Sequence, residues 1–186
     1  MSLAKVIGTW GPIIGPEFYK PYMKELQKTI EGHKKSFFSD YKQNKDMFHM
    51  FKSTPIDKLK VVIVTQTDEF DSYFAYGIED ELLNGFDVNL SSTQDYKWLM
   101  GQGVMFLPRE LTWGNASHKE WHVFTDEVIN IIAGNPDIMI VTHIQQVKDL
   151  VKELHPTTPI YDFIEWKDID KWCKDKFNTE IKWSPK

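Results

Sequence analysis

A chain of 186 residues with a hydrophobic content of 41% can bury one sizeable core, and we expect a single domain over residues 1–186. Neither a run of about 18 apolar residues nor an apolar N-terminal signal segment occurs, which predicts an intracellular protein without a membrane partner. The net charge of −5 and the single arginine, Arg109, give no compositional support for binding phosphates. The only cysteine, Cys173, excludes an intrachain disulfide and is predicted to be a packed thiol.

Helical spacing of apolar residues alternates along the chain with short, continuous apolar runs, which are typical of strands covered on both faces. In chain order the predicted elements are a helix over Pro21–Ile30, a strand over Val61–Val64, a strand over Val104–Leu107, a helix over His118–Ile132, a strand over Ile138–Val141, and helices over Gln145–Leu154 and Asp168–Phe177. This alternation predicts right-handed crossovers and a three-layer α/β/α domain with a central, mainly parallel sheet.

Ligands of such domains bind beyond the carboxyl ends of the strands. The segments that follow the predicted strands or face those ends are residues 65–70, 108–113, 142–144 and 155–160. We therefore expect Gln66, Pro108 and His155 to line one cleft.

Several segments of the sequence resemble the family 1 uracil-DNA glycosylases, in the same order, over roughly residues 10–183. Lys60–Val64 followed by Gln66 resembles the strand that leads into the family's catalytic loop, and His155–Pro159 resembles its HPSP loop. Further similar segments are Glu17–Met23, Ser53–Lys60, Phe74–Ile78, Gln102–Leu107, Ala116–Asp126 and Lys176–Trp183. The resemblance implies the uracil-DNA glycosylase fold, with a four-stranded sheet.

The resemblance also assigns the catalytic positions of that family. His155 takes the place of the histidine that assists the leaving base. Thr67 stands where the family has its catalytic aspartate, and a threonine cannot act as a carboxylate base at neutral pH. Asp68, one residue further, is the candidate to replace it after a small shift of the loop.

Four base-pocket positions complete the assignment, and with Thr67 they form the predicted pocket. Gln66 is retained, whereas Glu69, Asp80 and Pro108 replace the tyrosine, the stacking phenylalanine and the base-reading asparagine. Pro108 has neither a side-chain amide nor a backbone N–H, so uracil loses its two-point reader. The two acids would repel an anionic leaving base, although a carboxylate can accept a hydrogen bond from an exocyclic amine.

The predicted DNA contacts are altered as well. Thr142 and His143 align with the family's Gly-Ser loop, and Pro156 and Thr157 belong to the HPSP-like loop. Ile160 takes the place of the leucine that wedges into DNA, and it is still apolar enough to enter between bases.

We predict a uracil-DNA glycosylase-like protein whose uracil excision is lost or greatly reduced, and which binds DNA or a protein partner. The DNA would be single-stranded or a distorted duplex, because an unstacked base costs less to extrude. One alternative is an active DNA glycosylase with a changed base preference, and another is a weak but genuine uracil-DNA glycosylase. No cofactor and no metal are expected, because His118 and His122, four residues apart, have no further evident ligands.

Overall fold

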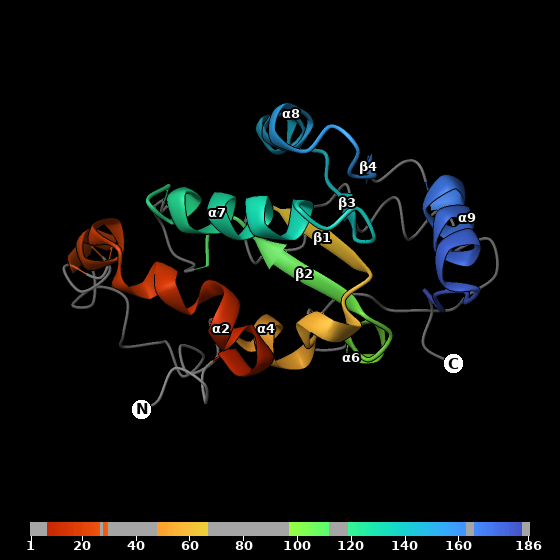
Figure 1. Cartoon of the computed structure of the whole chain (residues 1–186), viewed down its shortest axis with the longest axis horizontal. Coiled ribbons are helices and arrows are strands. Elements are labelled where there is room, and N and C mark those ends of the chain that lie inside the picture. The colour runs from red at the N-terminus through yellow and green to blue at the C-terminus, as the bar shows by residue number, and fades with distance from the viewer. Residues whose placement is uncertain are drawn as a thin grey trace.

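The computed structural model describes residues 7–26, 28–29, 48–66, 97–111, 119–162 and 166–183. Residues 21–26 and 28–29 are helical. The other elements of these ranges, shown in Figure 1, are η1 (Gly8–Trp10), α2 (Gly11–Ile14), η2 (Gly15–Tyr19), α4 (His49–Ser53), η4 (Ile56–Lys58), β1 (Val61–Thr65), α6 (Lys97–Met100), β2 (Val104–Pro108), α7 (Trp121–Ala133), β3 (Met139–Val141), α8 (Gln145–Leu154), β4 (Ile160–Tyr161) and α9 (Trp166–Phe177).

The four strands form one parallel sheet in the order β2-β1-β3-β4. Strand β1 is central, and it pairs with β2 from Val61↔Val104 to Thr65↔Pro108. It also pairs with β3, which pairs in turn with β4 at the edge of the sheet. The three predicted strands are therefore adjacent and parallel, and the predicted fold class is confirmed. Strand β4 supplies the fourth strand that the resemblance implies, directly after the HPSP-like segment, where no strand is predicted from the apolar pattern.

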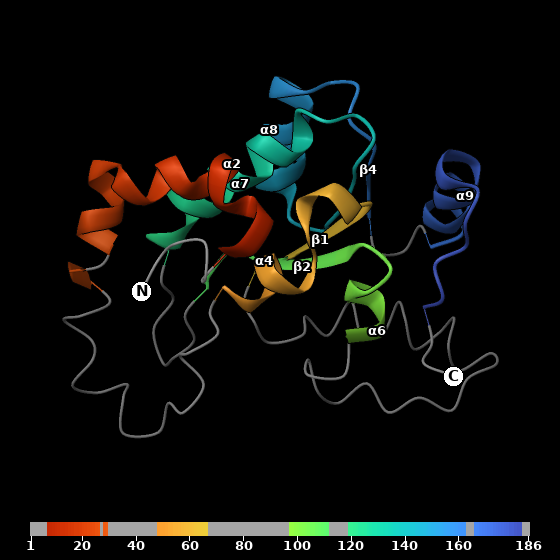
Figure 2. The same ribbon diagram turned by 60° about the horizontal axis from the view of Figure 1, so that its bottom comes forward.

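Helices cover both faces of the sheet, which explains why β1 is apolar at every position. Along β1, Val62 and Val64 belong to a core cluster shared with Phe51 and Phe124, whereas Val61 and Ile63 belong to a second cluster. Side chains of successive strand residues point to opposite faces. Figure 2 shows α2, α7 and α8 on one side of β1 and β2, with α6 on the other. The result is the three-layer arrangement that the sequence predicts.

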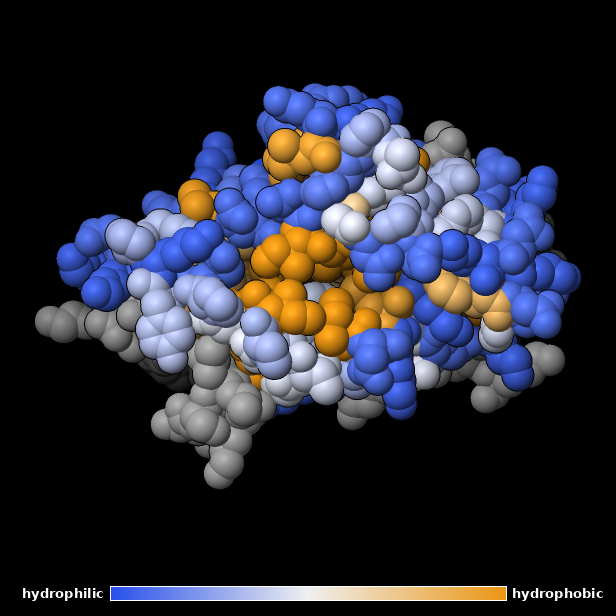
Figure 3. Space-filling model, viewed as in Figure 1, coloured by the Kyte–Doolittle hydropathy of each residue, from blue (hydrophilic) through white to orange (hydrophobic). Residues whose placement is uncertain are grey.

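The surface on the α7 side is mixed in character. Figure 3 shows apolar residues gathered near the middle of this face, with hydrophilic residues around them. The large hydrophobic side chains that are exposed in the described ranges are Ile13, Tyr19, Val123 and Leu154. No helix within those ranges has the length and apolar character that crossing a membrane requires.

Cys173 lies on α9 and is fully buried in the second core cluster. Burial raises the pKa of its thiol to about 12, Asp170 raises the pKa further, and Lys60 opposes the shift. The reactive thiolate is therefore scarce in the folded protein. We expect a chromogenic disulfide reagent at pH 8 to label native protein at least about 10²-fold more slowly than urea-unfolded protein, because labelling requires opening of the structure. Equal rates would contradict the buried placement of Cys173.

Candidate functional site

The carboxyl ends of β1 and β2 bring two polar side chains together. The backbone ladder continues beyond the strands, because Arg109 N donates to Thr65 O over 2.8 Å and Glu110 N donates to Gln66 O over 3.0 Å. Gln66 and Glu110 are thereby held side by side at the edge where α/β proteins bind ligands.

A third side chain, His122 from the first turn of α7, completes this group. Gln66 Nε2 donates to Glu110 Oε1 over 2.7 Å. His122 Nε2 lies 3.2 Å from the same Glu110 oxygen and 3.1 Å from Gln66 Nε2. The Glu110 side chain is only 4% exposed, whereas that of His122 is 21% exposed. We call these residues the Gln66–Glu110–His122 cluster.

Arg109 anchors the helices around this cluster. Its guanidinium binds both carboxylate oxygens of Asp126 on α7, with Nε 3.0 Å from Oδ1 and Nη2 2.7 Å from Oδ2. Nη1 donates to Gln146 Oε1 of α8 over 3.3 Å, and Thr125 Oγ1 donates to the Arg109 carbonyl over 3.0 Å. Since Arg109 is 5% exposed and ion-paired, the only arginine of the chain is not a phosphate contact.

The two predicted DNA-contact residues at the end of β3, Thr142 and His143, differ in burial. Thr142 is fully buried, and its hydroxyl donates to Val64 O over 3.0 Å and accepts from Ile144 N over 3.1 Å. It closes the turn into α8 and faces the sheet. His143 follows directly at the carboxyl edge and is partly exposed.

The structure does not bring His155 together with Gln66 and Pro108. His155 follows the last residue of α8, and its Nε2 lies 2.8 Å from Asn130 Oδ1 near the end of α7. Further along, Thr158 Oγ1 donates to Ala133 O. The Pro159 carbonyl accepts from Ile140 N, at the amino-terminal end of the sheet.

The expected clustering of His155 is therefore wrong, and topology supplies the reason. Helix α8 begins beyond the carboxyl end of β3 and returns the chain to the start of β4, which is parallel to β3. A residue between α8 and β4 must lie at the amino edge. Strand β1 spans five residues, so the two edges are about 13 Å apart along the sheet.

The same topology corrects the remainder of the HPSP-like segment. Ile160 is the first residue of β4, pairs with Ile140 and packs against the first core cluster, so it is not a wedge at a loop tip. Pro156 and Thr157 are exposed in the turn that precedes this strand, at the amino edge. None of the three lies beside the Gln66–Glu110–His122 cluster.

Pro108 and Gln66 are brought together as predicted. Pro108 is the last residue of β2 and pairs with Thr65, the residue before Gln66. Four other predicted site residues, Thr67, Asp68, Glu69 and Asp80, lie outside the described residues, and so does His118.

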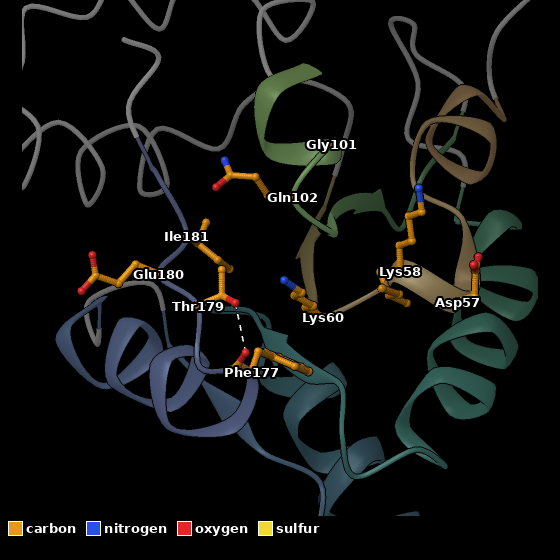
Figure 4. Close-up of a pocket in the computed structure, with 10 residues that line it drawn as sticks. Asp57, Lys58, Lys60, Gly101, Gln102, Phe177, Thr179, Glu180 and Ile181 are labelled. Atoms are coloured by element: carbon orange, nitrogen blue, oxygen red, sulfur yellow. Dashed lines mark hydrogen bonds between the residues drawn. The ribbon is translucent and has the colours of Figure 1, made fainter.

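A separate cavity of about 540 Å³ opens at the amino edge between the start of β1, the start of β2 and the end of α9. Figure 4 shows Lys58, Lys60, Gln102, Phe177 and Glu180 around it. Several of the charged and polar side chains around the cavity already bind other groups of the chain. Lys60 Nζ lies 5.2 Å from the centre of the Phe177 ring, Glu180 binds Lys174, and the Gln102 amide binds the Lys182 backbone. The cavity is thus distinct from the carboxyl-edge cluster.

Across the described part of the chain, no three His, Cys, Asp or Glu side chains are grouped so that they could hold a metal ion. In particular, the carboxyl-edge cluster offers only the Glu110 carboxylate and the His122 imidazole, together with the Gln66 amide. A structural zinc site takes four ligands.

Sequence reasoning missed Glu110 and paired His122 only with His118. A signal was present, because Glu110 follows a predicted strand by three residues and His122 lies near the start of the helix predicted over His118–Ile132, beyond the same end. Both features place side chains at the carboxyl edge of a parallel sheet.

Comparisons with known proteins bear on the family and the fold of the chain. No protein-family model matches the chain. Proteins named uracil-DNA glycosylase are 31% identical over 150 residues in Azobacteroides pseudotrichonymphae, covering 69% of this chain and 68% of that protein, and 32% identical over 152 residues in Francisella tularensis, covering 68% of each. A 27% identical relative from Levilactobacillus brevis is covered over 64% of its length, so the aligned part spans about two thirds of these relatives.

The crystal structure of mimivirus uracil-DNA glycosylase is similar in fold. Its TM-score is 0.77 at 14% identity, and the match covers 98% of this chain and 89% of that one. The likeness extends the shared architecture beyond the parts that align in sequence.

Proposed function

The chain belongs to the uracil-DNA glycosylase family, and we propose that it binds DNA bases at the carboxyl edge while its uracil excision is lost or greatly reduced. Family membership supports a base-binding role. The finer features, namely the family 1 assignment and the altered catalytic positions, belong to this proposal.

The observation that carries the proposal is the position of Pro108. It ends β2 at the carboxyl edge, beside Thr65 and Gln66, where a residue of the sheet would contact a bound base. Its ring offers no hydrogen bond donor or acceptor, and its nitrogen carries no hydrogen. A uracil edge at this point would lose hydrogen bonds that it makes in water, and unpaired polar groups are costly.

The position of His155 supports the same conclusion. A histidine at the amino edge, bound to Asn130, does not reach a base held beside Gln66. The burial of Arg109 in its pair with Asp126 removes the strongest phosphate-binding side chain. We therefore expect DNA binding to be modest, to depend on lysines and to favour single strands.

The direct test is an excision assay on a single-stranded oligonucleotide with one deoxyuridine, in parallel with an active uracil-DNA glycosylase. We expect the rate to be at least about 10²-fold lower than that of the active enzyme, because loss of one preorganised group already costs this much. Turnover at the rate of the active enzyme would contradict the proposal.

The variant Pro108→Asn restores an amide at the end of β2 and makes the test specific. It should raise the affinity for the uracil-containing strand relative to the same strand with an abasic site in place of the deoxyuridine, because the restored amide can bond only to a base edge. An equal change for both strands would mean that Pro108 does not lie at the base edge.

A second candidate function is an active DNA glycosylase with a changed base preference. The Gln66–Glu110–His122 cluster favours it, because a carboxylate and an imidazole in contact at a ligand-binding edge are suited to acid–base chemistry. The same assay with thymine, cytosine and modified pyrimidines separates the two candidates.

A further inference from the structure

Glu110 and His122 form a carboxylate–imidazole pair that the family resemblance does not assign to catalysis. Glu110 Oε1 lies 2.7 Å from Gln66 Nε2 and 3.2 Å from His122 Nε2. A buried carboxylate needs hydrogen bond donors to offset its lost hydration. The Gln66 amide supplies one N–H, and His122 supplies a second when its Nε2 carries the proton.

This arrangement leaves the other nitrogen of the imidazole for chemistry. His122 Nδ1 makes no hydrogen bond within the described part of the chain, and the side chain is 21% exposed. When a carboxylate holds the proton on one ring nitrogen, the other nitrogen presents a lone pair and can take a proton.

The first turn of α7, which carries His122, is fixed to the end of β2. Thr125 Oγ1 donates to the carbonyl of Arg109, the residue before Glu110, over 3.0 Å. Trp121 is 2% exposed in the first core cluster, and Asp126 binds the Arg109 guanidinium. The imidazole therefore stands on rigid elements, as acid–base groups require.

We propose that His122 is the general base of the carboxyl-edge site and that Glu110 is the residue that positions it. This inference rests on the proposed function, in which a DNA base binds at that edge. Nδ1 takes a proton from water as the water oxygen bonds to C1′ of the deoxyribose. The C1′–N bond breaks with its electron pair on the base, which leaves as an anion and is protonated by solvent.

The first experiment reads the proton on His122 by long-range ¹H–¹⁵N NMR of the full chain. We expect neutral His122 to carry its hydrogen on Nε2, and we expect Glu110→Gln to shift the Nε2 resonance. This tautomer is required for the hydrogen bond from His122 Nε2 to Glu110 on which the proposal rests. A neutral His122 with its hydrogen on Nδ1, accepting from Gln66 through Nε2, would overturn the proposal.

The second experiment measures abasic-site formation in a single-stranded oligonucleotide with one deoxyuridine. Glu110→Gln and His122→Asn should each lower the residual rate about 10²-fold, since general-base catalysis contributes about 10²–10⁴-fold. The substrate concentration for half-maximal rate should change little. Glu153→Gln, an exposed carboxylate near the end of α8, and Val123→Ala, the exposed neighbour of His122, are matched controls that should retain the rate.

These assays decide between the two roles once thermal melting has shown that each variant is folded. Residual excision that persists in both cluster variants overturns the general-base role and leaves the proposed function standing. If the unaltered protein shows no excision above the uncatalysed rate, the general-base role is likewise overturned and the proposed function stands. Rapid excision that disappears in His122→Asn supports the general base and contradicts the proposed loss of activity.

Discussion

Replacement of Gly103 with alanine is expected to lower the free energy of unfolding by about 3 kcal/mol or more. Gly103 has a φ of +92°, and a Cβ added there would lie 2.2 Å from the backbone oxygen of Lys58. Its carbonyl accepts from the amides of Lys60 and Val61, so the backbone cannot move without loss of the hydrogen bonds that begin the sheet. Urea-induced unfolding followed by tryptophan fluorescence measures the change.

Gly11→Ala is the matched control. Gly11 has helical dihedral angles with a φ of −48°, and an added Cβ would meet no atom within 4 Å. Alanine at such a position stabilises a protein by about 0.4–1 kcal/mol through the unfolded state. If Gly103→Ala were as stable as Gly11→Ala, the close approach of Gly103 to Lys58 would be refuted.

Removal of the Arg109 side chain is the second large effect that we expect. Arg109→Met should lower the free energy of unfolding by about 3 kcal/mol, because it breaks a largely buried ion pair and removes links between β2, α7 and α8. Asp126 is 31% exposed and regains some hydration, which places the value at the lower end for buried pairs. The same denaturation measurement applies.

Lys174→Met serves as the comparison for an ion pair in solvent. Lys174 binds Glu180 over 2.6 Å, but both side chains are more than 60% exposed. Such pairs are screened by water and salt, and we expect no measurable change in stability. Equal effects of the two methionine substitutions would mean that Arg109 is not buried as described.

The sequence predicted the sheet more closely than it predicted the site. Strands β1, β2 and β3 were found within one residue of their ends, because continuous apolar runs reflect burial on both faces. Helix α8 was predicted with its observed bounds, since its apolar residues recur at helical spacing. Strand β4 has only two residues, and its pairing with β3 depends on residues distant in sequence, so no local pattern revealed it.

Because β4 was not predicted, part of the predicted site was assigned to the wrong edge of the sheet. With β4 unrecognised, His155 and Ile160 were assigned by the similarity of a short motif rather than by the crossover that precedes the strand. Gln66 and Pro108 were assigned from strands that were correctly predicted, and they do lie together. Glu110 and His122 meet only because α7 packs against the end of β2, a contact that hydrophobic periodicity alone does not specify.

The unequal pairing of the strands has a consequence for local stability. β1 and β2 share five residue pairs, whereas β4 is attached at the edge by two. We therefore expect amide hydrogens of β4 to exchange with solvent through local opening, and those of β1 to exchange only when the whole sheet unfolds. Gln66 and Glu110 extend the more protected ladder, so the cluster keeps its geometry when the β4 side of the sheet opens.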